Sequence, residues 1–270
     1  MAPPASRPFV VSRRAFTLGL LAAPLLGRAV DAEPTPSVPI LVYHRFAPTA
    51  VDGMTVRTAT FDAHLRVLER LGCQVMPLLD WVAWRRGDST KPLPARAVAI
   101  TADDGHRSQF ESMASRLDER RWPYTLFVYP SAISNASYAM TWSEVADLAA
   151  RPGVSVQSHT FWHPNFIQER RRLSPGAFTK FAADQLRRSR DVIEQRLSRP
   201  VSLLAWPFGL SDEGVRRQAA DSGYRAGFSL GNRSATMADP IFDLPRHLMV
   251  DAVGERKLEL LLSRAFARQD

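Results

Sequence analysis

Two adjacent carboxylates at the end of an apolar run are the residues of this sequence with the clearest capacity for chemistry. Asp103, Asp104 and Gly105 follow residues 98–100 (Val-Ala-Ile), which predict a short strand buried on both faces. Glycine lets the chain turn sharply after such a strand. Two neighbouring carboxylates both stay ionised near neutral pH only when a cation or strong hydrogen-bond donors hold at least one of them. The pair therefore indicates a metal site or a solvated turn.

A pair of histidines follows a second predicted strand. His159 and His163 come after the β-branched stretch 154–157, and a helical turn or a tight loop can direct both imidazoles toward one point. Two imidazole nitrogens and one carboxylate oxygen form the three-ligand set of a catalytic zinc site, which leaves one position open for water. The histidine pair alone also fits a surface or core role. Together with the carboxylates it indicates a site, because active sites form at the carboxyl ends of strands in barrels and open α/β sheets.

The sequence resembles the polysaccharide deacetylases with the NodB homology domain, carbohydrate esterase family 4. The matching segments are TADDG (101–105), SHTFWH (158–163) and AWPFG (205–209), within residues 98–250. The resemblance implies a distorted (β/α)7-8 barrel and a metal-dependent hydrolase that removes acetyl groups from N-acetylated sugars. It also implies Asp103 as general base, and Asp104, His159 and His163 as ligands of a divalent metal, which we expect to be Zn2+.

The segment LVYHRF (41–46) resembles a subgroup of this family, the exported deacetylases of poly-N-acetylglucosamine biofilm polymers. The resemblance implies that His44, at the end of the first predicted strand (40–44), is the general acid. Imidazolium can protonate a departing amine near neutral pH, so we expect a bell-shaped pH dependence that needs ionised Asp103 and protonated His44. His247, near the family's fifth motif, is the alternative acid.

Ala205 is a departure from the family pattern. Many relatives carry an arginine two residues before the proline of AWPFG, bonded to the catalytic carboxylate, although the biofilm-polymer subgroup tends to lack it. Arg246 is the candidate for the replacing cation. The resemblance also places an oxyanion-stabilising backbone N–H near Phe208. Aromatic and groove-wall residues are candidate sugar contacts, although such residues in a barrel are as often core: Trp162, Trp206, Pro207 and Phe208.

The length and composition of the chain fit one domain with a hydrophobic core, preceded by a targeting segment. The chain has 270 residues, of which 45% are hydrophobic. We assign a signal peptide to residues 1–32, a linker to 33–38 and a single barrel domain to 39–270. Arg13 and Arg14 precede a short apolar run (18–26) and resemble a twin-arginine signal; the run is too short to span a membrane. We therefore expect export to the periplasm or beyond the cell.

The charge of the chain bears on which molecules it binds, and its cysteine content on whether it forms a disulfide. The formal net charge is +8, and without residues 1–32, which hold four arginines and one aspartate, 31 basic and 26 acidic residues remain, a net charge of +5. The arginine-rich runs 170–172 and 187–188 are typical of solvated faces, and no nucleic-acid motif is present. We expect an N-acetylated polysaccharide as substrate and exopolysaccharide synthesis or export machinery as a possible partner. The single Cys73 cannot form an internal disulfide and is expected to be buried.

Periodicity and capping residues predict the elements that position the site. We expect a helix that starts at the N-cap Thr60 and carries His64 on its surface, and a capped helix over 141–150. Further helices are predicted over 79–86, 108–121 and 174–198, and strands over 124–129 and 201–205. The alternation of strands and helices agrees with a barrel.

Two other functions remain open from the sequence. One is a noncatalytic, metal-containing carbohydrate-binding protein of a polysaccharide export or modification assembly, supported by the missing motif arginine. The other is a metal amidohydrolase or esterase that acts on a different acylated substrate.

Overall fold

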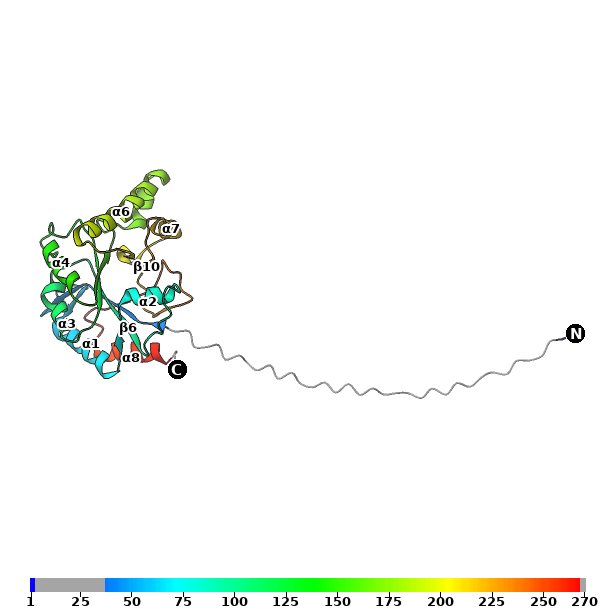
Figure 1. The fold of residues 1–270 in the computed structure, drawn as a ribbon, viewed down its shortest axis with the longest axis horizontal. Helices are drawn as coiled ribbons and strands as arrows, with labels where there is room; N and C mark the ends of the chain where they lie inside the picture. The colour runs from blue at the N-terminus through cyan, green and yellow to red at the C-terminus, as the bar shows by residue number, and fades with distance from the viewer. Residues whose placement is uncertain (3–36, 268–270) are drawn as a thin grey trace. The chain divides into compact units, whose positions relative to one another are not determined.

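A curled sheet of parallel strands forms the centre of the computed structural model, which describes residues 1–2 and 37–267 (Figure 1). Around the sheet the strands follow in this order: β10 (Ala226–Phe228), β9 (Leu203–Ala205), β8 (Val154–Ser158), β7 (Tyr124–Val128), β6 (Ala97–Asp103), β2 (Ile40–Tyr43) and β12 (His247–Leu248), with β5 (Gln74–Val75) also paired to β6. Every one of these strand pairs is parallel.

The segment 244–249 joins the two edges of the curled sheet. On one side β12 pairs with β2, and the Met249 N–H donates to the Val42 carbonyl. On the other side the Leu244 N–H donates to Gly227, and the Gly231 N–H donates to Arg246. Because this segment bonds to both edges, the sheet curls into a distorted barrel, and the (β/α) barrel prediction is confirmed.

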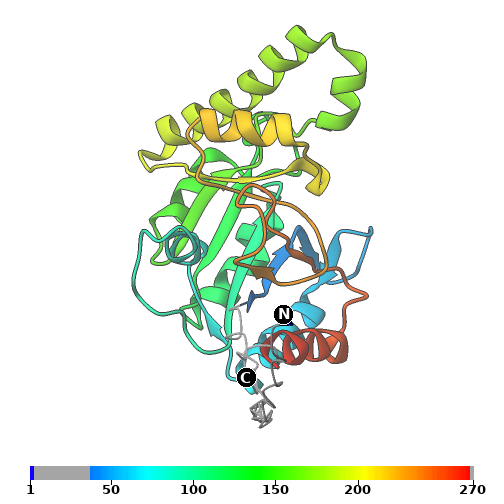
Figure 2. The ribbon, with the colours of Figure 1, turned by 90° about the vertical axis from the view of Figure 1, so that its right-hand side faces the viewer.

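Helices surround the sheet (Figures 1 and 2). The long helix α6 (Pro175–Leu197) packs beside α7 (Glu213–Asp221), and α8 (Glu255–Phe266) packs against α1 (Thr58–Arg70). Two small sheets flank the barrel: β1 (Ser37–Val38) pairs antiparallel with β11 (Ala235–Thr236), and β3 (Arg45–Ala47) pairs parallel with β4 (Thr55–Arg57). The helical segments are α1 (Thr58–Arg70), α2 (Leu78–Arg85), the π-helix η1 (Gln109–Met113), α3 (Ala114–Asp118), α4 (Trp142–Ala150), α5 (Phe166–Arg172), α6 (Pro175–Leu197), the 3-10 turn η2 (Pro207–Gly209), α7 (Glu213–Asp221) and α8 (Glu255–Phe266).

Successive strand residues face opposite sides of the sheet and divide the core in two. In β6, Val98 and Ile100 pack into the large cluster shared with the surrounding helices. Ala97 and Ala99 pack into a second cluster with side chains of β9, β10 and α2. The alternation places Asp103 on the same face of β6 as Ala97 and Ala99, toward the second cluster. The catalytic carboxylate predicted from sequence therefore faces the interior of the curl.

The structure confirms several predicted elements. Helix α4 has a complete capping box between Thr141 and Glu144, and α6 begins with Pro175 in its first turn. Cys73 is buried, as expected. The segment predicted as one helix over 108–121 contains the π-helix η1 and the short α3 instead.

Three predictions around the first helix and the linker are wrong. Helix α1 begins at Thr58, with Arg57 rather than Thr60 in the capping position. His64 is fully buried, and its imidazole bonds the Tyr43 hydroxyl and the Val253 carbonyl. The described fold begins at Ser37 with the buried strand β1, so the last two residues assigned to the linker belong to the domain.

The predicted signal peptide lies almost wholly outside the described residues. In the part of the chain that is described, no helix has the length and apolar character needed to cross a membrane.

Gly105, directly after the carboxylate pair, is expected to tolerate no side chain. Its φ is +68°, and an added Cβ would lie 2.7 Å from Ile133 Cδ1 and 3.2 Å from Val128 Cγ1. We expect Gly105→Ala to lower the free energy of unfolding by about 2–4 kcal/mol, from left-handed backbone strain and overpacking together. Gly72→Ala is the matched control, because Gly72 has φ +64° and open space; it should cost only about 1–2 kcal/mol. Urea unfolding of both variants measures the difference, and equal losses would contradict the steric argument.

Candidate active site

The two carboxylates at the end of β6 have different surroundings. Asp103 is buried, and Arg246 binds it through two hydrogen bonds: Nη1 donates to Oδ1 at 2.7 Å and Nη2 donates to Oδ2 at 2.6 Å. Arg246 is itself fully buried, so the pair is a desolvated bidentate ion pair. Asp104 is partly exposed and has φ +76°, which turns the chain out of the strand.

The pKa of the Asp103 carboxyl is low despite its burial. Burial raises the pKa, but the guanidinium of Arg246, followed by the His159 charge, outweighs it and holds the pKa at about 2. The carboxylate is therefore ionised throughout the neutral range. Arg246 is the residue that we expected to replace the missing motif arginine. Its guanidinium offsets the negative charge of Asp103.

The histidine pair lies in a tight loop after β8, not on a helical turn. Thr160 and His163 both have φ of +65°, and the His163 N–H donates to Thr160 Oγ1 at 3.2 Å. The His159 Nδ1 donates to the Ala205 carbonyl at 2.8 Å. This hydrogen bond fixes the tautomer and leaves the Nε2 lone pair available to a ligand.

Asp104, His159 and His163 place one donor atom each within 4.8 Å of one another. Asp104 Oδ1 lies 3.6 Å from His159 Nε2 and 3.7 Å from His163 Nε2. Ligands bound at about 2.0–2.1 Å to a tetrahedral zinc lie roughly 3.4 Å apart, close to these separations. Burial, and then the charge of His159, lowers the pKa of His163 to about 4, so its imidazole is neutral, as a metal ligand must be. The donor set fits a divalent metal.

His44 lies beside this cluster. It follows β2, next to Asp103 in the register of β2 and β6, and the charges of Asp103 and Asp104 act on its imidazole. Burial lowers the pKa of His44, and these two carboxylates partly oppose that effect. The first of the two candidate acids is thus in the site.

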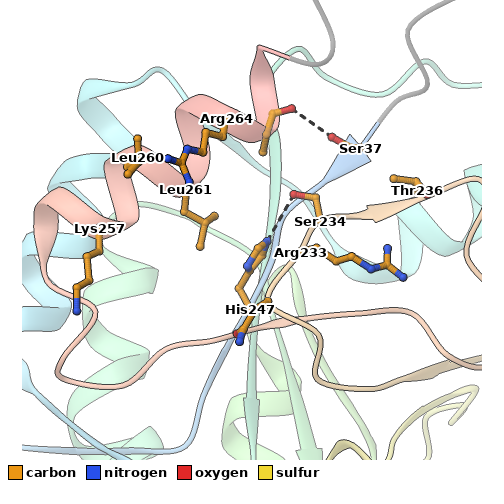
Figure 3. A pocket seen from close by; sticks show the side chains of 11 residues that line it. Ser37, Arg233, Ser234, Thr236, His247, Lys257, Leu260, Leu261 and Arg264 are labelled. Carbon is orange, nitrogen blue, oxygen red and sulfur yellow. Dashed lines mark hydrogen bonds between the residues drawn. The ribbon is translucent and has the colours of Figure 1, made fainter.

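His247 is not in the site. It begins β12 directly after Arg246, so in this extended segment its side chain faces the other side of the sheet. Figure 3 shows its imidazole in a cavity of about 620 Å³ lined by α8 and the segment that contains Ser234, whose hydroxyl lies 3.5 Å from Nε2. Burial lowers its pKa to about 4. Strand alternation therefore separates His247 from Asp103 and favours His44 as the acid.

The predicted sugar contacts divide into two groups. Trp206 and Pro207 are buried, and Trp206 Nε1 donates to the Phe242 carbonyl, so neither side chain can stack on a sugar in this structure. We therefore no longer expect Trp206 or Pro207 to contact the substrate. Phe208 is 55% exposed, with its ring 4.6 Å from that of His163, and Trp162 is 43% exposed. These two rings remain available to a substrate.

Sequence reasoning did not single out Tyr129 or Gln109. The Tyr129 ring lies 5.4 Å from that of His163, and its hydroxyl bonds the Tyr138 hydroxyl. The Gln109 amide bonds two backbone carbonyls of the site, those of His44 and Asp103. Tyr129 ends a predicted strand at the same edge as the carboxylates, a position that could have marked it. The sequence carries no comparable signal for Gln109.

Comparisons with known proteins identify a family. A family model described as polysaccharide deacetylase matches residues 90–227, slightly more than half of the chain. The poly-beta-1,6-N-acetyl-D-glucosamine N-deacetylase of Escherichia coli K12 is 26% identical over 140 residues, which are 46% of this chain but only 20% of that protein.

Solved structures share the fold. The Streptococcus pyogenes deacetylase PplD in complex with acetate superposes with a TM-score of 0.73 at 19% identity, over 84% of this chain and 99% of that one. IcaB from Ammonifex degensii gives a TM-score of 0.72 at 19% identity, over 84% and 97% of the two chains.

Removing the arginine of the buried pair should destabilise the protein strongly. Arg246→Gln leaves the Asp103 carboxylate buried without its cation, so we expect a loss of about 3–5 kcal/mol in the free energy of unfolding. Arg70→Gln, which breaks exposed ion pairs with Glu255 and Glu259, is the control and should leave stability nearly unchanged. Chemical unfolding of the two variants tests this, and similar small losses would show that the buried pair does not hold the site together.

Proposed function

Because this chain belongs to the polysaccharide deacetylase family, we propose that it is a metal-dependent hydrolase that removes N-acetyl groups from N-acetylhexosamine residues of an extracellular or cell-envelope polysaccharide. One observation carries the proposal: a carboxylate paired with a buried arginine, three candidate metal donors and a partly buried imidazole converge at one edge of the barrel. A sugar-binding role alone requires no such combination.

Asp104, His159 and His163 would hold the divalent cation, and Zn2+ suits their nitrogen and oxygen donors. When bound, the cation would polarise the acetyl carbonyl and lower the pKa of a coordinated water. The chain's own contribution is to orient the His159 ring through the Ala205 carbonyl and to keep the His163 imidazole neutral through burial.

Asp103 is proposed as the general base that accepts the proton of the attacking water. Arg246 occupies one position on each carboxylate oxygen, and each oxygen keeps a further lone pair for the water. The ion pair also fixes the direction of the carboxylate, which limits the positions from which it can accept a proton.

His44 is proposed as the general acid that protonates the departing amine so that acetate leaves. The bell-shaped pH dependence then has its acid limb set by Asp103 and its alkaline limb set by His44. Because burial lowers the pKa of His44, we expect the alkaline limb at lower pH than an exposed histidine would give. From the family resemblance, the backbone N–H near Phe208 is the proposed oxyanion donor.

The proposed natural substrate is a poly-N-acetylglucosamine polymer. The identity with the E. coli enzyme and the LVYHRF segment support this choice. Phe208 and Trp162 are the proposed sugar contacts because both rings are exposed beside the metal donors or in the same loop. We also propose export through the twin-arginine pathway to the periplasm or beyond, where exopolysaccharide synthesis or export machinery would be the partner.

The noncatalytic alternative has lost its main support. It rested on the missing motif arginine, and Arg246 supplies a guanidinium to the same carboxylate from the segment just before β12. A deacylase of a different substrate remains an outcome of the experiment below.

The proposed activity predicts acetate release that needs both metal and Asp103. After chelation and reconstitution with Zn2+, the protein should release acetate from β-1,6-linked N-acetylglucosamine oligomers. Asp103→Asn should lower the rate by roughly 10²–10⁴-fold, the usual contribution of a general base, while zinc content per chain stays unchanged. Asp118→Asn, at an ion pair with Arg151 outside the site, is the control and should keep its activity. Metal binding without acetate release from any N-acetylated oligomer would point to another acyl substrate or to a binding protein.

Substitution of the two candidate acids should give opposite results. We expect His44→Gln to lower kcat by roughly 10²–10⁴-fold and to remove the alkaline limb of the pH profile. His247→Gln should leave kcat and the profile nearly unchanged, because its side chain faces the cavity beside α8. Steady-state rates between pH 4 and 10 measure both, and loss of activity in the His247 variant alone would reverse the assignment.

A further inference from the structure

A side-chain amide extends the pairing of β2 with β6 beyond the last backbone rung. The ladder ends with Tyr43 opposite Ala102, so the next residues in register are His44 and Asp103. The Gln109 Nε2 donates one hydrogen bond to the His44 carbonyl at 2.9 Å and another to the Asp103 carbonyl at 2.5 Å. Gln109 therefore joins the proposed acid and the proposed base through their main chains.

This connection lies where the two strands separate. After His44 the chain enters β3 at Arg45, and after Asp103 it turns away through Asp104 and Gly105, both with positive φ. Beyond this point β2 and β6 are not joined by backbone pairing. The two hydrogen bonds of Gln109 bridge the ends of the strands at this point.

The imidazole of His44 depends on its backbone for its orientation. Nδ1 is buried, and neither ring nitrogen has a hydrogen-bond partner among the residues that the structure describes. The Asp103 side chain, by contrast, is fixed by Arg246. A shift of the His44 main chain would therefore move the ring relative to a stationary carboxylate.

Gln109 has a firm support of its own. It is fully buried at the start of the π-helix η1, and its N–H donates to the His106 carbonyl at 2.9 Å. The preceding Ser108 accepts a hydrogen bond from the Phe46 N–H at 2.9 Å, so two consecutive residues hold the chain that follows β2. Such π-helical turns are frequent at functional sites.

We propose that Gln109 is a positioning residue, which sets the relative placement of His44 and Asp103 without touching substrate. The inference rests on the proposed function, because it assigns a role within that reaction. Its Oε1 is buried with no partner among the described residues, which disfavours the fold, so stability alone does not account for glutamine here.

The test compares two buried glutamines. Gln109→Met keeps the side-chain length but removes both hydrogen bonds. Gln157→Met is the matched control, because Gln157 is also buried and its Oε1 accepts from the backbone N–H groups of Ser202 and Leu203, just before and at the start of β9. We expect Gln109→Met to lower kcat by roughly 10- to 100-fold with KM changed less than twofold, since small displacements of reacting groups cost about this much. Gln157→Met should lose thermal stability but keep kcat within twofold.

A further variant and an NMR measurement complete the test. Gln109→Asn keeps the amide but is too short to reach both carbonyls, so it should lose most of the same activity; it provides the measurement if Gln109→Met does not fold. In NMR spectra of the zinc-loaded protein, the His44 ring resonances should shift or broaden in the Gln109 variants and not in Gln157→Met. Retained kcat with unchanged His44 resonances, or equal kcat losses at matched stability in both glutamine variants, would overturn the proposal. Absence of acetate release from the unaltered protein counts against the proposed function, and the NMR comparison then still tests the positioning.

Discussion

The buried ion pair between Arg246 and Asp103 is the interaction on which the rest of the site depends. Two desolvated charges are tolerated only when their geometry and remaining hydrogen bonds are good. Here the guanidinium meets both carboxylate oxygens, donates from Nε to the Ser229 carbonyl at 3.3 Å and lies over the Phe127 ring. Because Arg246 belongs to the segment that joins the two edges of the sheet, the same contact ties that segment to β6 and fixes the proposed base.

Backbone strain is concentrated around the metal donors. Four non-glycine residues there have φ values between +59° and +76°: Asp104, Thr160, His163 and Phe208. Such conformations typically cost of order 1–3 kcal/mol each and persist where the surrounding structure holds them. The hydrogen bonds of Thr160 and of the His159 ring supply that support. The arrangement costs some stability but leaves the proposed ligands already oriented toward one point, which fits the proposed metal site.

The sequence predicts the site residues that a local motif identifies. It does not predict the residues whose environment is formed by distant segments of the chain. Strand-end carboxylates, the histidine spacing and helix caps such as Thr141 are local signals. The structure brings Asp104 and the two histidines together at one edge. His64 was wrongly placed on the surface, because its burial depends on Tyr43 and on Val253, 189 residues away. Trp206 lies in the expected segment, but its side chain packs into the core cluster that the helices share. Which face of β9 meets the helices decides this, and the sequence does not give it. Gln109 has no motif, since its partners are main-chain carbonyls of two other segments. The phase of the last strand, which the sequence does not give, decides that His247 faces the cavity beside α8 rather than Asp103.

The separation of 143 residues between Asp103 and Arg246 has a consequence for biosynthesis. A ribosome delivers the carboxylate, the metal donors and His44 well before it delivers the guanidinium. Until the last strand docks, the carboxylate has no cation to offset its burial, and closing so long a loop is slow compared with local helix formation. A nascent or truncated chain that ends before residue 246 therefore contains every residue proposed to hold metal or transfer a proton, yet lacks the one that allows the base to be buried in its ionised form.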